Sequence, residues 1–91
     1  MASIPSISRE YLHIPVVGAT DTMPVEIAIV GRDTEPADSD WNAAAWDGTD
    51  AKLLIGPGSA LALAEGVYSV WVRVTASPER PALKAGLLRI T

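Results

Sequence analysis

His13 is the one histidine of this 91-residue chain, so any mechanism that needs a base near neutral pH must use its imidazole. A catalytic histidine needs a nucleophile and an orienting carboxylate beside it. No recognisable motif places a serine or a carboxylate next to His13, which falls on the outward side of a strand-like stretch. We interpret it as a solvent-facing polar residue, and we predict no catalytic residues and no enzymatic activity.

Six carboxylates in the middle of the chain have the oxygen chemistry that calcium prefers. They are Asp33, Glu35, Asp38, Asp40, Asp47 and Asp50. Their spacing does not match an EF-hand loop, in which carboxylates alternate and a glycine makes the sharp turn. Acid-rich loops more often serve solubility. The prediction is therefore no metal site and no cofactor, and calcium binding by a loop stays open as the alternative.

The sequence also lacks signals for binding phosphate or nucleic acid. The turn Gly56-Pro-Gly58 has neither the lysine nor the hydroxyl residue that a nucleotide phosphate loop needs. Seven basic side chains oppose eleven acidic ones, and the net charge of −4 repels a phosphate backbone. The basic residues Lys52, Arg73, Lys84 and Arg89 are scattered singly and form no stripe. We predict no contact with nucleic acid.

Length and composition predict one globular domain that packing alone holds together. Hydrophobic residues make up 48% of the chain, and 91 residues bury one core with little room for a second. The absence of cysteine excludes disulfides and thiolate metal sites. The apolar runs are too short to cross a bilayer, and residues 1–8 lack the basic and apolar regions of a secretory signal. We therefore expect a protein made in a cytoplasm, with no membrane contact.

Short stretches of alternating apolar residues, separated by Gly- and Pro-rich turns, predict an all-β chain of about seven strands. The expected strands cover 9–17, 25–29, 41–46, 51–55, 61–63, 66–74 and 83–91. Residues 1–8 are interpreted as an N-terminal arm or edge strand, and 9–91 as a single domain. Pro15 lacks the donor of a central ladder, so the strand over 9–17 is expected at a sheet edge. Residues 31–40 predict a solvated loop, and Asp47-Gly48 predicts a hairpin turn.

The run over 66–74 is the clearest strand pattern. Counting by twos places Tyr68, Val70, Val72 and Val74 on the buried face, with Ser69, Trp71, Arg73 and Thr75 on the other. A glycine just before a tyrosine at the start of a strand resembles the tyrosine corner of immunoglobulin-like sandwiches, in which the phenolic hydroxyl binds upstream backbone. The strand spacing fits a sandwich or a small barrel, and this corner favours an immunoglobulin-like β-sandwich of antiparallel strands.

Aromatic residues are the candidates for an interaction surface. An outward Trp71 near Leu87 of the last strand would expose a large apolar area of the kind found at protein interfaces. The alternative is that a loop or the N-terminal arm of the same chain covers Trp71. Of Trp41 and Trp46, one is expected in the core, and the other is free for surface, interface or sugar-stacking roles. The candidate interface residues are Trp71, Leu87, Tyr11 and Trp46, and the strands over 9–17 and 83–91 are the expected docking edges.

Four segments together resemble the small immunoglobulin-like virion proteins of tailed phages that infect actinobacteria. They are Ser8-Arg-Glu-Tyr-Leu-His-Ile-Pro-Val-Val-Gly18, Pro24-Val-Glu-Ile-Ala28, Ala37-Asp-Ser-Asp-Trp41 and Tyr68-Ser-Val-Trp-Val-Arg-Val-Thr75, the last followed by Ser77-Pro-Glu-Arg-Pro81. The resemblance spans nearly the whole chain. Val70 stands where antibody-type domains have their second cysteine.

The resemblance implies a structural part without enzymatic activity, assembled in many copies on the particle. It implies a place at the capsid surface or at the head-to-tail neck, and capsid, portal or neck subunits as partners. The family has no catalytic motif, so no functional residue carries over to this chain. A carbohydrate-binding or adhesion module of the same fold is the alternative function, and it predicts that Trp46 or Trp71 stacks on a glycan.

Overall fold

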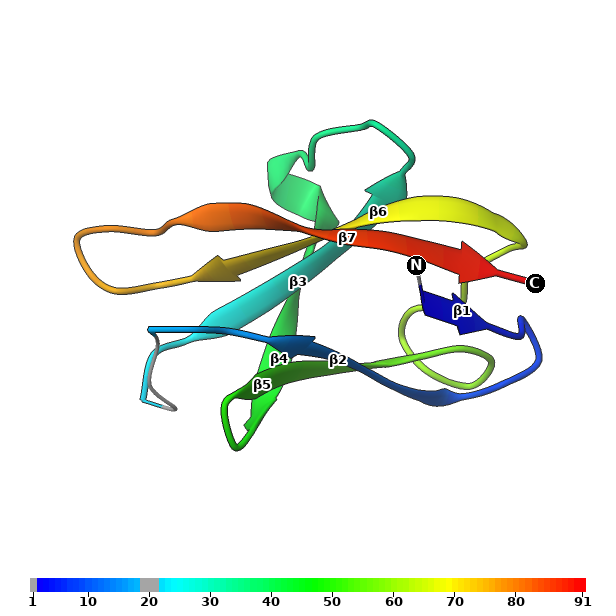
Figure 1. The fold of residues 1–91 in the computed structure, drawn as a ribbon, viewed down its shortest axis with the longest axis horizontal. Coiled ribbons are helices and arrows are strands. Elements are labelled where there is room, and N and C mark those ends of the chain that lie inside the picture. Colours follow the sequence, from blue (N-terminus) through cyan, green and yellow to red (C-terminus); the bar gives the residue numbers. More distant parts are fainter. Residues whose placement is uncertain (1, 19–21) are drawn as a thin grey trace.

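The computed structural model describes residues 2–18 and 22–91, and the described chain is built from β-strands with no α-helix (Figure 1). The strands are β1 (Ala2–Ile4), β2 (Glu10–Pro15), β3 (Val25–Gly31), β4 (Trp41–Asp47), β5 (Asp50–Ile55), β6 (Gly66–Val74) and β7 (Ala82–Ile90). A single 3₁₀ turn, η1 (Asp38–Asp40), precedes β4. The predicted all-β class is therefore confirmed.

The seven strands form one curled sheet in the order β1-β7-β6-β3-β4-β5-β2, which gives a half-barrel. All neighbours are antiparallel except β1 and β7, which run parallel. β4 makes the bend, because its first half (41–44) pairs with β3 and its second half (45–47) pairs with β5. In Figure 1, β6 and β7 consequently lie above β2 and β5, and β3 and β4 cross between the two levels.

The inner side of the curl holds one hydrophobic core. Its members are Ile4, Leu12, Ile14, Val25, Ile27, Ala51, Ile55, Val70, Val72, Val74, Leu88 and Ile90. The inward face predicted for β6 is confirmed at Val70, Val72 and Val74, and Tyr68 is half-buried against the same core. The Tyr68 hydroxyl donates to the Ala64 carbonyl at 2.7 Å, which is the upstream bond expected of a tyrosine corner.

Local sequence explains the hairpin between β4 and β5 and the place of β2 at the edge of the sheet. Asp47 lies opposite Asp50, and Gly48 between them has φ +61°, a left-handed value that glycine adopts without steric cost. This confirms the hairpin expected from Asp47-Gly48. β2 lies at the end of the strand order, so Pro15 is in an edge strand as predicted.

The strand expected over 61–63 is wrong. The Ser59 hydroxyl donates to the Gly56 carbonyl at 2.6 Å, and its oxygen accepts the Leu61 N–H at 3.2 Å. Gly56 N–H also donates to the Leu61 carbonyl, so these groups are satisfied inside a turn and join no ladder. Leu61 and Leu63 pack on the core as an irregular segment.

The N-terminal residues 2–4 form an edge strand, which was one of the two interpretations of 1–8; residue 1 lies outside the described part. β1 pairs with Leu88 to Ile90 of β7, and Ile4 is buried. Thr91 N–H donates to the Ile4 carbonyl and Ser6 N–H to the Thr91 carbonyl, at 3.1 and 2.7 Å. These bonds fix the first strand against the last.

The outer face of β6 differs from the prediction at Ser69, which is fully buried. The loop after β3 lies against this position: Asp33 N–H donates to the Ser69 hydroxyl at 3.1 Å, and the Asp33 carboxylate is 3.9 Å from the Lys84 ammonium of β7. The strand alternation is correct, but a loop of the same chain covers part of the face that it predicted to be exposed.

Candidate protein-interaction surface

The half-barrel is open between its two end regions. β2 is the last strand at one end of the sheet, and at the other end β1 covers only 88–90 of β7. Residues 82–87 of β7 therefore have no strand on that side among the described residues. We call the opening between β2 with its continuation (11–18) and this part of β7 (82–88) the seam.

One groove of about 270 Å³ occupies the first half of the seam. Leu12, Ile14 and Pro15 of β2 form one wall, and Ala85 and Gly86 of β7 belong to the other. Val70 and Leu88, two members of the hydrophobic core, also line it. The groove thus opens onto core side chains.

A second groove of about 260 Å³ continues along the same two walls. Its lining includes Val16 and Val17 after β2 and Leu83 at the start of β7. Val72 and Val74, the next inward residues of β6, face it from the core. The successive valines of β6 thus line the seam from one groove to the other.

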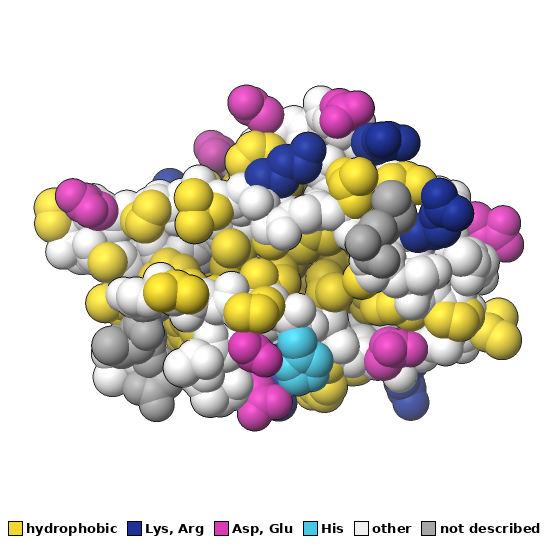
Figure 2. All heavy atoms as spheres, in the orientation of Figure 1, with side chains coloured by type: hydrophobic (Ala, Val, Ile, Leu, Met, Phe, Trp, Pro, Cys, Tyr) yellow, Lys and Arg dark blue, Asp and Glu magenta, His cyan; other side chains and the backbone are white. Residues whose placement is uncertain are grey.

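Four large hydrophobic side chains of the described chain are exposed: Ile7, Tyr11, Val17 and Leu83, with exposed fractions of 87%, 49%, 100% and 65%. Val17 and Leu83 line the second groove. Tyr11 is in β2, Ile7 and Val17 are in the segments that flank β2, and Leu83 is in β7. Figure 2 shows hydrophobic side chains in a band across this face, with most charged side chains above and below it. Concentrated exposed apolar area of this kind marks interaction surfaces.

The predicted pair of Trp71 and Leu87 is not directly opposed. A β-bulge between Val70 and Trp71 shifts the pairing of β6 with β7, so that Trp71 lies opposite Lys84 and Leu87 lies opposite Ser69. Leu87 is half-buried and lines the first groove. Trp71 is half-buried, and its indole N–H is buried with no acceptor among the described residues.

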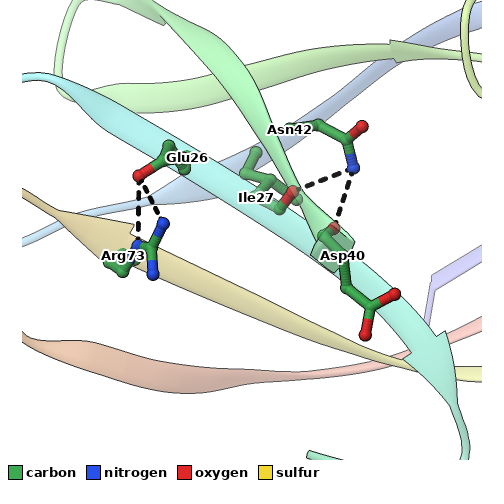
Figure 3. Close-up of polar contacts among 5 residues, drawn as sticks. All are labelled: Glu26, Ile27, Asp40, Asn42 and Arg73. Atoms are coloured by element: carbon green, nitrogen blue, oxygen red, sulfur yellow. Dashed lines mark hydrogen bonds and ion pairs between the residues drawn. The ribbon is translucent and has the colours of Figure 1, made fainter. Parts of the chain in front are cut away.

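A second group on the outer face is structural. The Arg73 guanidinium donates to the Glu26 carboxylate at 2.8 and 3.1 Å (Figure 3). Its carbon lies 4.4 Å from the centre of the Trp41 ring. The side chains of Arg73 and Glu26 are 12% and 30% exposed, so this pair is largely withdrawn from solvent. It joins β6, β3 and β4 through contacts that sequence spacing alone did not indicate.

Trp46 belongs to the core, so we do not include it in the seam surface. Its indole N–H donates to the Met23 carbonyl at 2.8 Å, and its ring packs with the core residues. Trp41, on the opposite side of the sheet, stacks with Arg73. Glycan stacking needs an open ring face, and both Trp46 and Trp71 are half-buried.

His13 lies on the exposed surface of β2 and belongs to the lining of the first groove. Its Nδ1 is 3.8 Å from the Asp47 carboxylate, beyond hydrogen-bond distance, and both side chains are exposed. The Tyr11 ring is 6.4 Å from the His13 ring, and the Lys52 ammonium lies 4.6 Å from the Tyr11 ring centre. These contacts give a mixed polar and aromatic surface beside the seam.

The acidic residues are dispersed. Asp33 faces Arg32 and Lys84, and Asp40 accepts the Ala37 N–H at 2.8 Å. Across residues 2–18 and 22–91, no three His, Asp or Glu side chains are close enough together to hold a metal ion. Within the same residues, no helix is long and apolar enough to cross a membrane.

Comparison with known proteins gave no relative. Neither a scan of protein-family models nor searches of curated proteins and of solved structures found a match.

Proposed function

We propose that this chain is a structural, non-enzymatic component of a tailed-phage virion that acts by contact with other virion proteins. The observation that supports a docking role is the seam, where exposed Val17 and Leu83 lie beside two apolar grooves between two sheet edges. The resemblance of the sequence to small phage virion proteins supplies the class of assembly. The protein is made in the host cytoplasm and ends in the particle, at the capsid surface or at the neck.

We also propose that the half-barrel is a variant of the immunoglobulin-like sandwich. Two features support the similarity to the immunoglobulin-like sandwich. The Tyr68–Ala64 hydrogen bond has the form of a tyrosine corner, and β4 divides its pairing between strands at the two levels of the fold.

Quantitative mass spectrometry of purified particles tests the proposed role. We expect the chain in virions of the phage that encodes it, in a fixed ratio to the major capsid protein. Tens of copies would indicate the neck and hundreds the capsid surface. A chain that is abundant in infected cells but absent from purified particles would contradict the proposal.

A further inference from the structure

We propose that the seam binds one extended polypeptide strand of another protein, which pairs with the free edge of β7 and places alternate apolar side chains in the two grooves. The inference rests on the proposed docking role and specifies the surface and the form of the partner. It commits to a single strand with apolar residues at every second position.

The backbone of β7 offers hydrogen-bonding groups to such a strand. The Pro81 carbonyl accepts from the Val74 N–H of β6. Because backbone groups alternate in direction along an antiparallel ladder, the N–H and C=O groups of Ala82 and Lys84 point away from β6, toward the seam. The backbone of Thr91 bonds to β1, on the same side of β7 as the seam. By the same alternation, the N–H and C=O groups of Leu87 also point toward the seam. The bulge near Gly86 absorbs the change in phase between these two stretches.

The chain itself already adds a strand to this edge. β1 lies parallel to β7 over 88–90, and its Ala2 end reaches the first groove. A partner strand in the seam would continue the line of β1 along 82–87. At about 3.3 Å per residue, this edge accommodates a strand of roughly six residues.

The groove linings define which side chains the partner inserts. His13 is the one ionisable residue in the lining of the first groove, and Glu79 is the one in the lining of the second. Because an unpaired charge is costly in an apolar site, the inserted side chains must be uncharged and mainly aliphatic or aromatic. Valines of β6 would contact them from the core.

A single strand suits the seam better than the edge of a second copy. Each groove lies between β2 or the residues just after it on one side and β7 on the other, so the space admits one chain but not a strand that carries its own sheet. Pro15 on β2 and the bulge on β7 also interrupt a long edge-to-edge ladder. We therefore assign the seam to a partner segment.

The test uses the full chain and an mRNA-displayed library of random octapeptides. We expect enriched peptides with apolar residues at alternate positions and no proline at their centre. Titration calorimetry of an enriched peptide should show a Kd that rises at least tenfold with Leu83→Lys, which puts a charge at the second groove. The matched control is Ala82→Lys, on the opposite face of the same strand, and it should change the Kd less than twofold.

Amide exchange with the peptide bound gives a second readout. The N–H groups of Lys84 and Leu87 should exchange at least tenfold more slowly, because a paired strand now accepts their hydrogens. If Leu83→Lys unfolds in circular dichroism, Val17→Lys replaces it, since Val17 is 100% exposed.

Three results would overturn the inference. The library yields no enriched peptide; or Leu83→Lys leaves peptide binding unchanged; or sedimentation shows a dimer that Leu83→Lys dissociates, which would make a second copy the occupant. A chain that is present in virions but binds no peptide loses this inference and keeps its proposed role. A chain that binds peptides but is absent from virions keeps this inference and loses its proposed role in the particle.

Discussion

Arg73 is the residue whose role is least evident from its place in the sequence, because charged residues on outward strand positions are usually solvated. In the fold it is bonded twice to Glu26 and lies against the Trp41 ring. We expect Arg73→Met to lower the free energy of unfolding by about 1.5 to 3 kcal/mol, since it leaves a partly buried carboxylate without its donor. Urea denaturation measures this change.

The matched control is Lys84→Met, on the same face of the neighbouring strand. The Lys84 ammonium is 3.9 Å from Asp33 and the side chain is 41% exposed, so its loss should change the free energy of unfolding by less than about 0.5 kcal/mol. Equal effects of the two variants would contradict the structural role given to the Glu26–Arg73 pair.

A second prediction at the level of single residues concerns the hydroxyl of Tyr68. Tyr68→Phe removes the hydroxyl that donates to the Ala64 carbonyl, and we expect a loss of about 0.5 to 1.5 kcal/mol of unfolding free energy. Tyr11→Phe removes a hydroxyl from an exposed ring and should be neutral. A thermal melt in which both variants match the parent chain would exclude a stabilising tyrosine corner.

Among the elements, the turn over 56–61 fixes the connector between β1 and β2. Gly56 has φ +108°, and a side chain there would collide with the backbone of Ser8 and Arg9. We expect Gly56→Ala to cost about 3 kcal/mol or more, from overpacking and backbone strain together. Gly48→Ala has open space around its Cβ and should cost only about 1 kcal/mol, from its left-handed φ. Chemical denaturation of the two variants checks the ranking, and the reverse order would contradict the tight contact at Gly56.

Element by element, the sequence predicted what local pattern controls and missed what distant contacts control. Alternation located β3 and β6, and Asp47-Gly48 located the hairpin. Side-chain bonds of Ser59 replaced the strand expected at 61–63. The burial of Ser69 depends on a loop 36 residues away in sequence, which periodicity cannot register.

The candidate surface was predicted in the same uneven way. The two docking edges expected from sequence, 9–17 and 83–91, contain the strands that bound the seam, and Leu87 lines its first groove. The sequence also predicts Trp71 and Trp46 at an interface, because large aromatic side chains are common there. One is opposite Lys84 on the outer face, and the other packs with the core, because a bulge and a strand bend decide their positions.

At the scale of the whole molecule, the choice between sandwich and barrel depends on β4. Because β4 pairs with both β3 and β5, the two levels are one sheet. Among the described residues, β2 and residues 82–87 of β7 lie across the seam from each other without a strand paired between them. Val17 and Leu83, two of the exposed large hydrophobic side chains of the described chain, line that opening. An open seam is thus the structural basis of the proposed docking role.

Amide hydrogen exchange along β7 of the free protein tests the open seam most directly. The backbone N–H groups of Leu83 and Leu88 point toward β6, and they should be protected as part of the ladder. The backbone N–H groups of Lys84 and Leu87 point toward the seam. We expect them to exchange at least a hundredfold faster than those of Leu83 and Leu88. Protection of Lys84 and Leu87 equal to that of Leu83 and Leu88 would mean that this edge is already paired, and it would contradict the half-barrel and the docking surface together.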